Sequence, residues 1–386
     1  MESLNIAFYT DSFLPAHDGV VTSILNFKAE LEKRGHTVYV FASGNSSTKS
    51  HIGGQKNVYI TRSLKFNRYP QYNVALTPFL SSLKLKELEP DIIHAHTPFT
   101  MGVSALALAR LNKIPITSTF HTLFTDKGII ANYLSKRASK VLSKYSWRYA
   151  KFFYNRCNSV IAPSMTVKQL LLNEGIENIS VVPNSVDTDK FNPEVDGRAV
   201  RKRLLGKDHE KLVLYVGRIS KEKKISVLLK AAMRMSDKKV KFVLVGTGPA
   251  MSHYTSMARR LGLGDVLTFE GFVSDKALPK YYAAADAFCI PSTFETQGIV
   301  SLEAMACGKP VVGADWRALH EIIKDGRNGE KFNAGDSAEC ARKLEKVLNN
   351  IGSYKETVRT AKQYSIEATT DKLLKVYRET INNMTV

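Results

Sequence analysis

Two glutamates in the last third of the chain, Glu295 and Glu303, stand eight positions apart in a stretch that predicts neighbouring structural elements. Its apolar and polar runs predict a strand, a loop and a helix over residues 286–290, 291–298 and 299–307. A helix that starts at Gly298 offers amides and a positive dipole end to an anion, and a nearby carboxylate can bind neutral hydroxyls. The segment therefore favours a site for a phosphate and a sugar, although most such glutamates are solvated charges. The candidate residues are Glu295, Gln297, Gly298, Ile299 and Glu303.

Two cations follow a predicted strand at 212–216, in the segment 217–224. Cations at the carboxyl end of a strand can neutralise the charge that develops on a departing diphosphate. Arg218 and Lys223 are the candidates for this role, and Lys224 is a further cation beside them. The alternative is a basic loop that only faces solvent.

The spacing of the two glutamates, their predicted elements and the Ala-Met-Ala-Cys-Gly tail resemble the retaining glycosyltransferases of the GT-B fold, of the group 1 or family 4 type. In that family the pair is called the E-x7-E motif. The resemblance implies a nucleotide-sugar donor as substrate, no cofactor and no obligatory metal. It implies that Glu295 lies nearer the transferred sugar and Glu303 at the ribose. Arg218 and Lys223 match the family's G-R-x-x-x-x-K pattern, in which Gly usually stands where this chain has Lys224.

Two further segments resemble motifs of the family. The turn at 244–249 is similar to a G-x-G-P turn near the nucleotide, which makes Gly248 a candidate donor-binding residue. Met251 stands where a dinucleotide fingerprint needs its third glycine, so a dehydrogenase is disfavoured. The triplet 187–189 spells the D-x-D of metal-dependent transferases, but its surroundings resemble the family's V-P-N-G-V-D segment, with Ser185 in place of Gly. We interpret the triplet as structural and expect no metal site.

The first half of the chain carries further candidates. Asp18 and Gly19 stand between a predicted strand and a helix, where a glycine lets the backbone approach an anion or an acceptor closely. Gly19 is a candidate for the donor and Asp18 for the acceptor. His121 follows a strand at 115–120, and a neutral imidazole there can hydrogen-bond a sugar hydroxyl or orient the acceptor. A lone histidine is more often structural, but the resemblance implies that this one lies beside the reacting sugar.

His94 and His96 stand two positions apart on a predicted strand at 91–96. We expect their side chains to point to opposite faces, so that they cannot both line one cleft and do not chelate a metal as a pair. Together with the segments at 18–20, 119–122 and 295–298, this segment looks like the family branch that glucosylates diacylglycerol.

Residues 127–156 contain eight Lys or Arg and no Asp or Glu. At about 100° per residue, six cations fall within an arc of roughly 120° and an apolar set fills the opposite arc. We expect the apolar arc to dock on the protein and the basic face to look outward, with Trp147 among the cations and without a core partner. The basic face consists of Lys136, Arg137, Lys140, Lys144, Arg148 and Lys151. The apolar arc consists of Leu134, Ala138, Val141, Leu142, Tyr145, Tyr149, Phe152 and Phe153.

A basic helix of this kind suits an anionic membrane surface, with Trp147 at the lipid interface. Nucleic acid is the competing partner of a cationic surface. No nucleic-acid-binding motif is recognisable, so we expect no nucleic acid partner.

Length and composition limit the kind of protein that carries these sites. A chain of 386 residues with 44% hydrophobic and 24% charged residues predicts a globular protein of two domains. The net charge of +19 attracts polyanions, unless it only solubilises the surface. We find no apolar run of about 18 residues and no secretion signal at the N-terminus. Four cysteines without C-x-x-C spacing suit reduced thiols. We expect a cytoplasmic protein associated peripherally with the cytoplasmic face of a membrane.

Strand-like runs alternate with helical segments throughout, which predicts parallel sheets with helices on both faces. The runs fall in two series, on either side of a linker rich in Pro, Asn and Asp at 182–193. We therefore expect two Rossmann-like domains, an acceptor-binding domain over 1–183 and a donor-binding domain over 194–363. The resemblance implies that a C-terminal helix at 364–386 crosses back to the first domain. Donor and acceptor should then meet in a cleft between the domains. The first series of runs is 5–10, 37–42, 91–96, 115–120 and 159–162, and the second is 212–217, 241–246, 266–271, 286–290 and 310–313.

The sequence thus predicts a retaining glycosyltransferase that moves a hexose to a membrane lipid, with glucose from UDP-glucose and diacylglycerol as the favoured pair. A mannosyltransferase acting on phosphatidylinositol or a soluble glycan is the nearest alternative. A sugar-nucleotide epimerase and a non-catalytic protein that binds sugar or nucleic acid are alternatives of another class.

Overall fold

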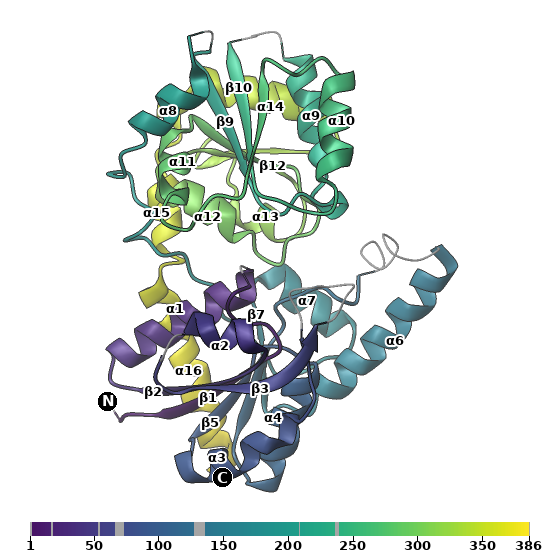
Figure 1. The fold of residues 1–386 in the computed structure, drawn as a ribbon, viewed down its shortest axis with the longest axis vertical. Coiled ribbons are helices and arrows are strands. Elements are labelled where there is room, and N and C mark those ends of the chain that lie inside the picture. Colours follow the sequence, from purple (N-terminus) through teal and green to yellow (C-terminus); the bar gives the residue numbers. More distant parts are fainter. Residues whose placement is uncertain are drawn as a thin grey trace. The chain divides into compact units, whose positions relative to one another are not determined.

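The computed structural model describes residues 2–16, 18–52, 55–65, 73–126, 136–207, 209–235 and 239–385. The chain forms two compact units, one of Met1–Ser185 with Ile366–Val386 and one of Val186–Ser365 (Figure 1). Each unit contains a largely parallel sheet covered by helices on both faces. The predicted α/β class with two parallel-sheet domains is therefore confirmed.

The sheet of the first unit has the strand order β4-β3-β2-β1-β5-β6-β7-β8 among the described residues. Neighbouring strands are parallel except β3 and β4, an antiparallel pair at one edge that the strand pattern did not predict. The strands are β1 (Asn5–Thr10), β2 (Thr37–Gly44), β3 (Val58–Lys65), β4 (Asn73–Ala75), β5 (Ile92–Ala95), β6 (Ile116–Thr119), β7 (Ser159–Ala162) and β8 (Ile179–Val181). The helices are α1 (Gly19–Lys33), α2 (Ser46–Ile52), the 3-10 turn η1 (Pro78–Leu80), α3 (Ser81–Leu88), α4 (Thr100–Leu111), α6 (Lys136–Tyr154), α7 (Met165–Asn173) and α16 (Ile366–Thr385).

The C-terminal helix α16 is part of the core of the first unit. Alternate residues of β1, Ile6 and Phe8, are fully buried in a cluster with apolar residues of α1 and α16. The α16 side chains in this cluster include Leu373 and Tyr377. The last helix of the chain therefore packs on a sheet whose strands come from the chain's first half.

The second unit has the strand order β11-β10-β9-β12-β13-β14, and its described strands all pair in parallel. The strands are β9 (Lys211–Val216), β10 (Val240–Val245), β11 (Leu267–Gly271), β12 (Ala287–Ile290), β13 (Val311–Ala314) and β14 (Gly329–Phe332). The helices are α8 (Arg198–Leu205), the 3-10 turn η2 (Lys221–Lys223), α9 (Ile225–Arg234), α10 (Met251–Arg260), α11 (Leu278–Ala284), α12 (Ile299–Ala306), α13 (Ala318–Ile322), α14 (Ser337–Asn349), the 3-10 turn η3 (Ile351–Ser353) and α15 (Thr357–Lys362).

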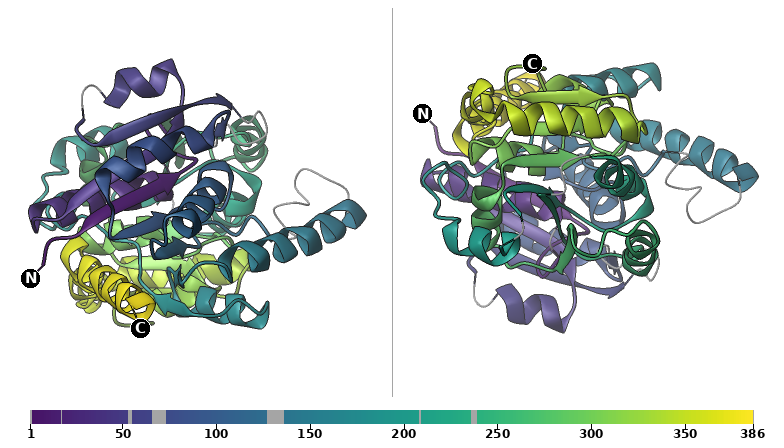
Figure 2. Two further views of the ribbon diagram at one scale, coloured as in Figure 1. Left: turned by 90° about the horizontal axis from the view of Figure 1, so that it is seen from below. Right: turned by 90° about the horizontal axis from the view of Figure 1, so that it is seen from above.

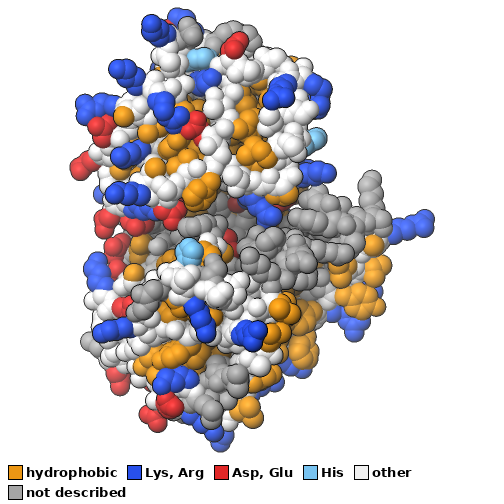
Figure 3. All heavy atoms as spheres, viewed as in Figure 1, with side chains coloured by type: hydrophobic (Ala, Val, Ile, Leu, Met, Phe, Trp, Pro, Cys, Tyr) orange, Lys and Arg blue, Asp and Glu red, His pale blue; other side chains and the backbone are white. Residues whose placement is uncertain are grey.

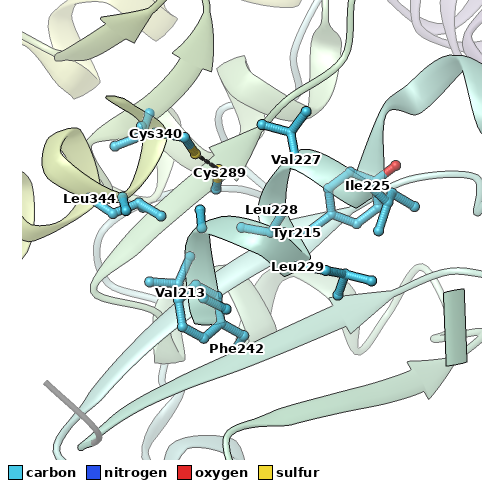
Figure 4. Packing of buried hydrophobic residues seen from close by; sticks show 14 of the residues in the cluster. Val213, Tyr215, Ile225, Val227, Leu228, Leu229, Phe242, Cys289, Cys340 and Leu344 are labelled. Carbon is cyan, nitrogen blue, oxygen red and sulfur yellow. Dashed lines mark hydrogen bonds between the residues drawn. The ribbon is translucent and has the colours of Figure 1, made fainter. Parts of the chain in front are cut away.

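The strand β9 shows how the second unit is packed. Val213 and Tyr215 join a core cluster with α9, α10 and α14, whereas Leu212 and Leu214 join a cluster with α8, α11 and α12 on the other face. Figure 4 shows part of the first cluster, in which the Sγ atoms of Cys289 and Cys340 lie 3.9 Å apart. All four cysteines of the chain are buried and unbridged, as expected for reduced thiols.

Candidate functional site

The strand order of the second unit changes direction between β9 and β12. The chain proceeds from β9 outward through β10 and β11, then returns to pair β12 with β9 and proceeds the other way. In an open parallel sheet, the loops at such a switch point leave a crevice at the carboxyl ends of the strands. The loops after β9 and β12 carry Lys223 and Glu295, so the fold brings these two predicted residues together.

Lys223 and Glu295 form an ion pair at this switch point. The Nζ of Lys223 lies 2.7 Å from Oε1 of Glu295 and 3.5 Å from the carbonyl oxygen of Phe294. The side chains are 21% and 12% exposed, respectively. The pair is thus partly shielded from water, where a charge interaction is stronger than at an open surface. It places a cation and a carboxylate side by side, one suited to a phosphate and the other to sugar hydroxyls.

Arg218 and Lys224 lie on the same loop as Lys223. The backbone carbonyl of Arg218 accepts a hydrogen bond of 3.1 Å from the hydroxyl of Tyr215, a fully buried residue of β9. Lys224 precedes α9 with φ 52° and ψ 34°, in the left-handed region. This is the position at which the resembling family usually has glycine, and the backbone geometry gives the reason, because only glycine adopts this region without cost.

The two glycine turns after β9 and β10 pack directly on each other. A Cβ on Gly246 would lie 2.0 Å from the carbonyl oxygen of Gly217, and one on Gly248 would lie 2.3 Å from that of Ile219. Both glycines are therefore required by backbone packing. A contact of Gly248 with a donor remains a prediction.

The start of α12 has the geometry that the sequence predicts. Gly298 caps the helix with φ 85°, and a Cβ there would lie 2.9 Å from a methyl carbon of Leu319. Gln297 is 1% exposed, and the helix begins at Ile299. The first amides of α12 thus follow directly on the loop that carries Glu295, which suits an anion near that carboxylate.

Glu303 has a partner that the sequence did not reveal. The hydroxyl of Tyr282, a fully buried residue of α11, donates a hydrogen bond of 2.6 Å to Oε2 of Glu303. Burial raises the pKa of Glu303, and the bond from Tyr282 opposes that rise by stabilising the carboxylate. No motif surrounds Tyr282, and its role follows only from the packing of α11 against α12.

The Asp-Thr-Asp triplet stabilises its own loop. Oδ1 of Asp187 accepts hydrogen bonds from the amides of Asp189 and Lys190 at 3.1 and 2.9 Å. A carboxylate that caps local amides in this way has the structural role that we expected.

In the first unit, Asp18 caps the helix that begins at Gly19. Its Oδ1 accepts from the amides of Val20 and Val21, both at 2.9 Å, and its Oδ2 accepts from the hydroxyl of Ser12 at 2.8 Å. The helix start at Gly19 is as predicted. Asp18 thus already bonds two of the first amides of α1. The contacts that we predicted for a donor at Gly19 and an acceptor at Asp18 stay predictions.

The sequence reasoning also missed a buried carboxylate at the switch point of the first sheet, between β1 and β5. Asp11 is fully buried and accepts hydrogen bonds from the hydroxyls of Thr97 and Thr100 and from the amide of Met101. Burial raises its pKa, while these bonds oppose the rise. Asp11 therefore caps α4 from the loop after β1, which accounts for a buried acid without a catalytic role.

The expectation that His94 and His96 point to opposite faces was wrong. Their rings stack with centroids 3.9 Å apart, because residues two positions apart on a strand share a face. His121, at the end of the neighbouring strand β6, joins them: its Nε2 lies 3.1 Å from Nδ1 of His96. Burial lowers the pKa of His121 to about 3, so its imidazole is neutral at physiological pH, as predicted.

The helix α6 presents its cations outward, as predicted, but docks through only one end of the predicted apolar arc, where Phe153 is buried and the hydroxyl of Tyr149 donates to the carbonyl oxygen of Pro98. The exposed fractions of Val141, Leu142, Tyr145 and Phe152 are 56%, 45%, 60% and 53%. The helix is instead buried along a narrow face beside that arc, where the hydroxyl of Ser143 donates a hydrogen bond of 2.6 Å to the carbonyl oxygen of Thr125. The buried residues are Ser139, Ser143, Ala150, Phe153 and Tyr154. The exposed cations are Arg137, Lys140, Lys144, Arg148 and Lys151, while the side chains of Lys136 and Leu134 lie outside the described residues.

The outer surface of α6 therefore has two halves, one cationic and one apolar. The first turns of the helix project from the rest of their unit (Figures 1 and 2), and hydrophobic side chains gather over them beside Lys and Arg (Figure 3). The expectation that Trp147 projects among the cations without a core partner was wrong. Its ring stacks on the buried Phe120 with centroids 6.1 Å apart and planes 4° apart.

No helix in the described part of the chain is both long and apolar enough to cross a bilayer. The same residues contain no group of three or more His, Cys, Asp or Glu that could hold a metal ion.

Comparisons with known proteins cover both units. Residues 17–190 match the family described as Glycosyltransferase Family 4, and residues 197–364 match that described as Glycosyl transferases group 1. An alpha-monoglucosyldiacylglycerol synthase of Streptococcus pneumoniae is 33% identical over 336 residues, which are 83% of this chain and 74% of the relative. A GDP-mannose-dependent alpha-mannosyltransferase of Corynebacterium glutamicum is 28% identical over 391 residues, 98% of this chain and 89% of the relative. Among solved structures, Anabaena HepE in complex with UDP is similar with a TM-score of 0.79 at 20% identity, covering 97% of this chain and 100% of that chain.

Proposed function

The chain belongs to the group 1 and family 4 glycosyltransferases, and we propose that it transfers glucose from UDP-glucose to a membrane lipid such as diacylglycerol, with retention at the anomeric carbon. Membership of the family makes the protein a transferase, which sets aside an epimerase and a non-catalytic binding protein. The choice of donor, acceptor and stereochemistry is the proposal.

The donor site that we propose lies at the switch point of the second sheet. Lys223 and Arg218 stabilise the departing diphosphate, together with the first amides of α12. Glu295 binds hydroxyls of the transferred sugar, and Glu303 binds the ribose. What supports these roles is the ion pair of 2.7 Å between Lys223 and Glu295, which places a phosphate-binding and a sugar-binding group in contact. An anionic diphosphate would share Lys223 with Glu295 when it binds.

Retention without a protein nucleophile is consistent with this geometry. In the proposed step, the bond between the anomeric carbon and the diphosphate breaks while the acceptor oxygen bonds from the same face and its proton passes to the leaving phosphate. The Glu295 carboxylate is engaged by Lys223, which suits a hydrogen-bond acceptor more than an attacking group. His121 is neutral, so it can hydrogen-bond a sugar hydroxyl without acting as a strong acid.

The single observation that carries the lipid acceptor is the divided outer surface of α6. Four apolar side chains, each about half exposed, lie beside five exposed cations on the same outer surface. Such a surface fits the boundary between anionic headgroups and acyl chains, where each cation contributes on the order of 1 kcal/mol. The name of the Streptococcus pneumoniae relative, which refers to a diacylglycerol lipid, supports the same acceptor class. The enzyme would then work peripherally at the cytoplasmic face of a membrane.

Vesicle binding and glycolipid synthesis test this proposal together. A variant with Lys140, Lys144, Arg148 and Lys151 changed to Ser should lose most of its binding to vesicles that contain anionic lipid and most of its activity on diacylglycerol in them. Its affinity for UDP-glucose should not change. A matched control removes four exposed cations of the second unit and should behave like the wild type. The control residues are Lys202, Lys207, Lys355 and Lys362.

The outcomes separate the parts of the proposal. If both variants bind vesicles equally well, or if the wild type prefers nucleic acid to anionic lipid at physiological salt, α6 is not a membrane surface. Replacing Val141 and Phe152 by Ser should weaken binding even at high salt, because the apolar contribution is not screened. The anomeric configuration of the product, read by NMR, tests retention.

A mannosyltransferase acting on phosphatidylinositol or a soluble glycan is the second candidate. The alignment with the Corynebacterium glutamicum mannosyltransferase over 98% of this chain favours it. A panel of UDP- and GDP-sugars with lipid and soluble acceptors decides between the two. Formation of a mannoside from GDP-mannose, without glucoside from UDP-glucose, would replace the first proposal by the second.

A further inference from the structure

Three imidazoles form a stack at the ends of β5 and β6 in the first unit. The ring of His96 lies between the other two, with centroids 3.9 Å from His94 and 5.4 Å from His121 and interplanar angles of 25° and 17°. His94 and His96 are 0% and 1% exposed. The role proposed for His121 uses only one ring of this stack, so the function of the other two needs an account.

A hydrogen bond links His96 to His121. Nδ1 of His96 and Nε2 of His121 are 3.1 Å apart, so one of the two nitrogens carries a proton and the other accepts it. Burial lowers the pKa of both rings, and each therefore carries a single proton at physiological pH. Two arrangements satisfy these conditions, with the shared proton on His96 or on His121.

The other nitrogen of His96 distinguishes the two arrangements. Nε2 of His96 is buried and has no hydrogen-bond partner among the described residues. The ring also packs edge to face on Phe8, with centroids 4.7 Å apart. A proton on Nε2 would leave a donor buried without a partner, which is rarer and costlier in proteins than an unused acceptor. The proton of His96 is thereby directed to Nδ1.

We propose that His96 is a positioning residue, which donates its Nδ1–H to Nε2 of His121 and so holds His121 in the tautomer that carries its proton on Nδ1. The consequence for catalysis rests on the proposed function: with Nε2 of His121 engaged by His96, the proton that His121 carries is the one on Nδ1. In the other tautomer, His121 would donate its Nε2–H to Nδ1 of His96, and its own Nδ1 would carry a lone pair instead of a proton.

His94 holds the middle ring in place. Its Nδ1 lies 2.7 Å from the hydroxyl of Tyr377 in α16, and its Nε2 lies 2.7 Å from Oγ1 of Thr119 in β6. Bonds at both nitrogens fix the orientation of this ring, and the stacked His96 cannot rotate freely over it. The C-terminal helix therefore reaches the histidine stack through one hydroxyl.

Histidine nitrogen NMR on the full chain tests the proposal without substrate. With selective 15N-histidine labelling, and His121 assigned by the signals lost in His121→Gln, wild-type His121 should show a protonated Nδ1 and an unprotonated Nε2. His96→Leu removes the donor and should shift His121 toward the other tautomer. His96→Asn should restore the wild-type pattern, because the amide nitrogen of Asn can occupy a position close to that of the imidazole Nδ1.

Kinetics and a control complete the test. His96→Leu should lower kcat about tenfold, equivalent to about 1.4 kcal/mol, with little change in KM for the nucleotide sugar, and His96→Asn should recover most of it. Ser159→Ala removes a hydroxyl of the same unit that bonds Thr380 and no ring of the stack, and should leave the His121 pattern unchanged. A protonated Nε2 on wild-type His121, or an unchanged tautomer in a folded His96→Leu variant, overturns the proposal. If His96→Leu does not fold, the wild-type spectrum decides. If the wild type transfers no sugar, the proposed function fails while the spectrum still decides the tautomer.

Discussion

The hydrogen bond from Tyr282 to Glu303 predicts how donor binding depends on pH. In the wild type, burial raises the pKa of Glu303 and the bond of 2.6 Å opposes that rise. A hydrogen bond to a charged group contributes about 1.5–3 kcal/mol. At about 1.4 kcal/mol per pKa unit, Tyr282→Phe should raise the pKa of Glu303 by about 1–2 units further.

The sign of the effect follows from the role proposed for Glu303. The carboxylate accepts hydrogen bonds from ribose hydroxyls, and the protonated acid accepts them more weakly. KM for the nucleotide sugar should therefore rise as the pH falls through the pKa of Glu303, and in Tyr282→Phe this rise should begin about 1–2 pH units higher. Because the folded-state pKa lies above the unfolded one, the stability contributed by this group is fully present below the unfolded pKa and is lost as the pH rises through the folded pKa. Tyr282→Phe should extend that stabilised range to higher pH.

The measurement is a series of KM values for the donor between about pH 5 and pH 8, with thermal unfolding recorded at the same pH values. Tyr281→Phe is the matched control, since Tyr281 is also buried in α11 but its hydroxyl donates to Glu270, at 2.8 Å. Its KM profile should equal that of the wild type. If Tyr282→Phe shows no displacement of the profile relative to Tyr281→Phe, the reasoning about Glu303 is refuted.

Four further predictions concern the donor site. Arg218→Ala should lower kcat by about 10² to 10³-fold, as for the loss of one strong electrostatic donor, and unchanged turnover would remove Arg218 from the mechanism. Glu295→Gln should replace the ion pair with Lys223 by a neutral hydrogen bond and depress turnover more than Glu303→Gln, which should mainly raise KM for the donor; negligible effects of both would show that the two glutamates are only solvated charges. Lys224→Gly should raise the free energy of unfolding by about 0.5–1 kcal/mol in denaturant titrations, because glycine adopts the left-handed backbone conformation of this position without the strain that a side chain causes. A lower free energy of unfolding would contradict that account. Activity should survive a chelator, whereas complete loss that added metal reverses would show an obligatory metal.

Much of the donor side could be predicted because its information is local. Gly298 marks the start of α12 through a positive φ that favours glycine, and the short apolar run before it is typical of a buried strand. The alternation of such strands with helices predicts the fold class without reference to any contact. The pair β3 and β4 escaped prediction, because β4 is an edge strand of three residues and β3 beside it is only partly buried, so neither has a continuous apolar pattern.

The partners of the site residues depend on contacts between distant segments. Tyr282 bonds Glu303 across 21 positions and Asp11 bonds Thr97 across 86, and no sequence pattern marks either pair. The stack of His94, His96 and His121 likewise requires two strands to lie side by side. The error on the faces of His94 and His96 was of another kind, since strand periodicity alone would have given the right answer.

The sequence by itself determined the fold class, the switch-point loops and the types of residue that they carry, because strand, helix and cap preferences act over a few neighbouring positions. Only the tertiary structure decided which face of α6 is buried. The apolar arc looked like the docking face, but the buried face includes Ser139, Ser143 and Ala150, and Val141 and Phe152 remain exposed beside the cations. The face of a helix that becomes buried depends on the shape of both packing surfaces, and a helical sequence pattern describes only one of them.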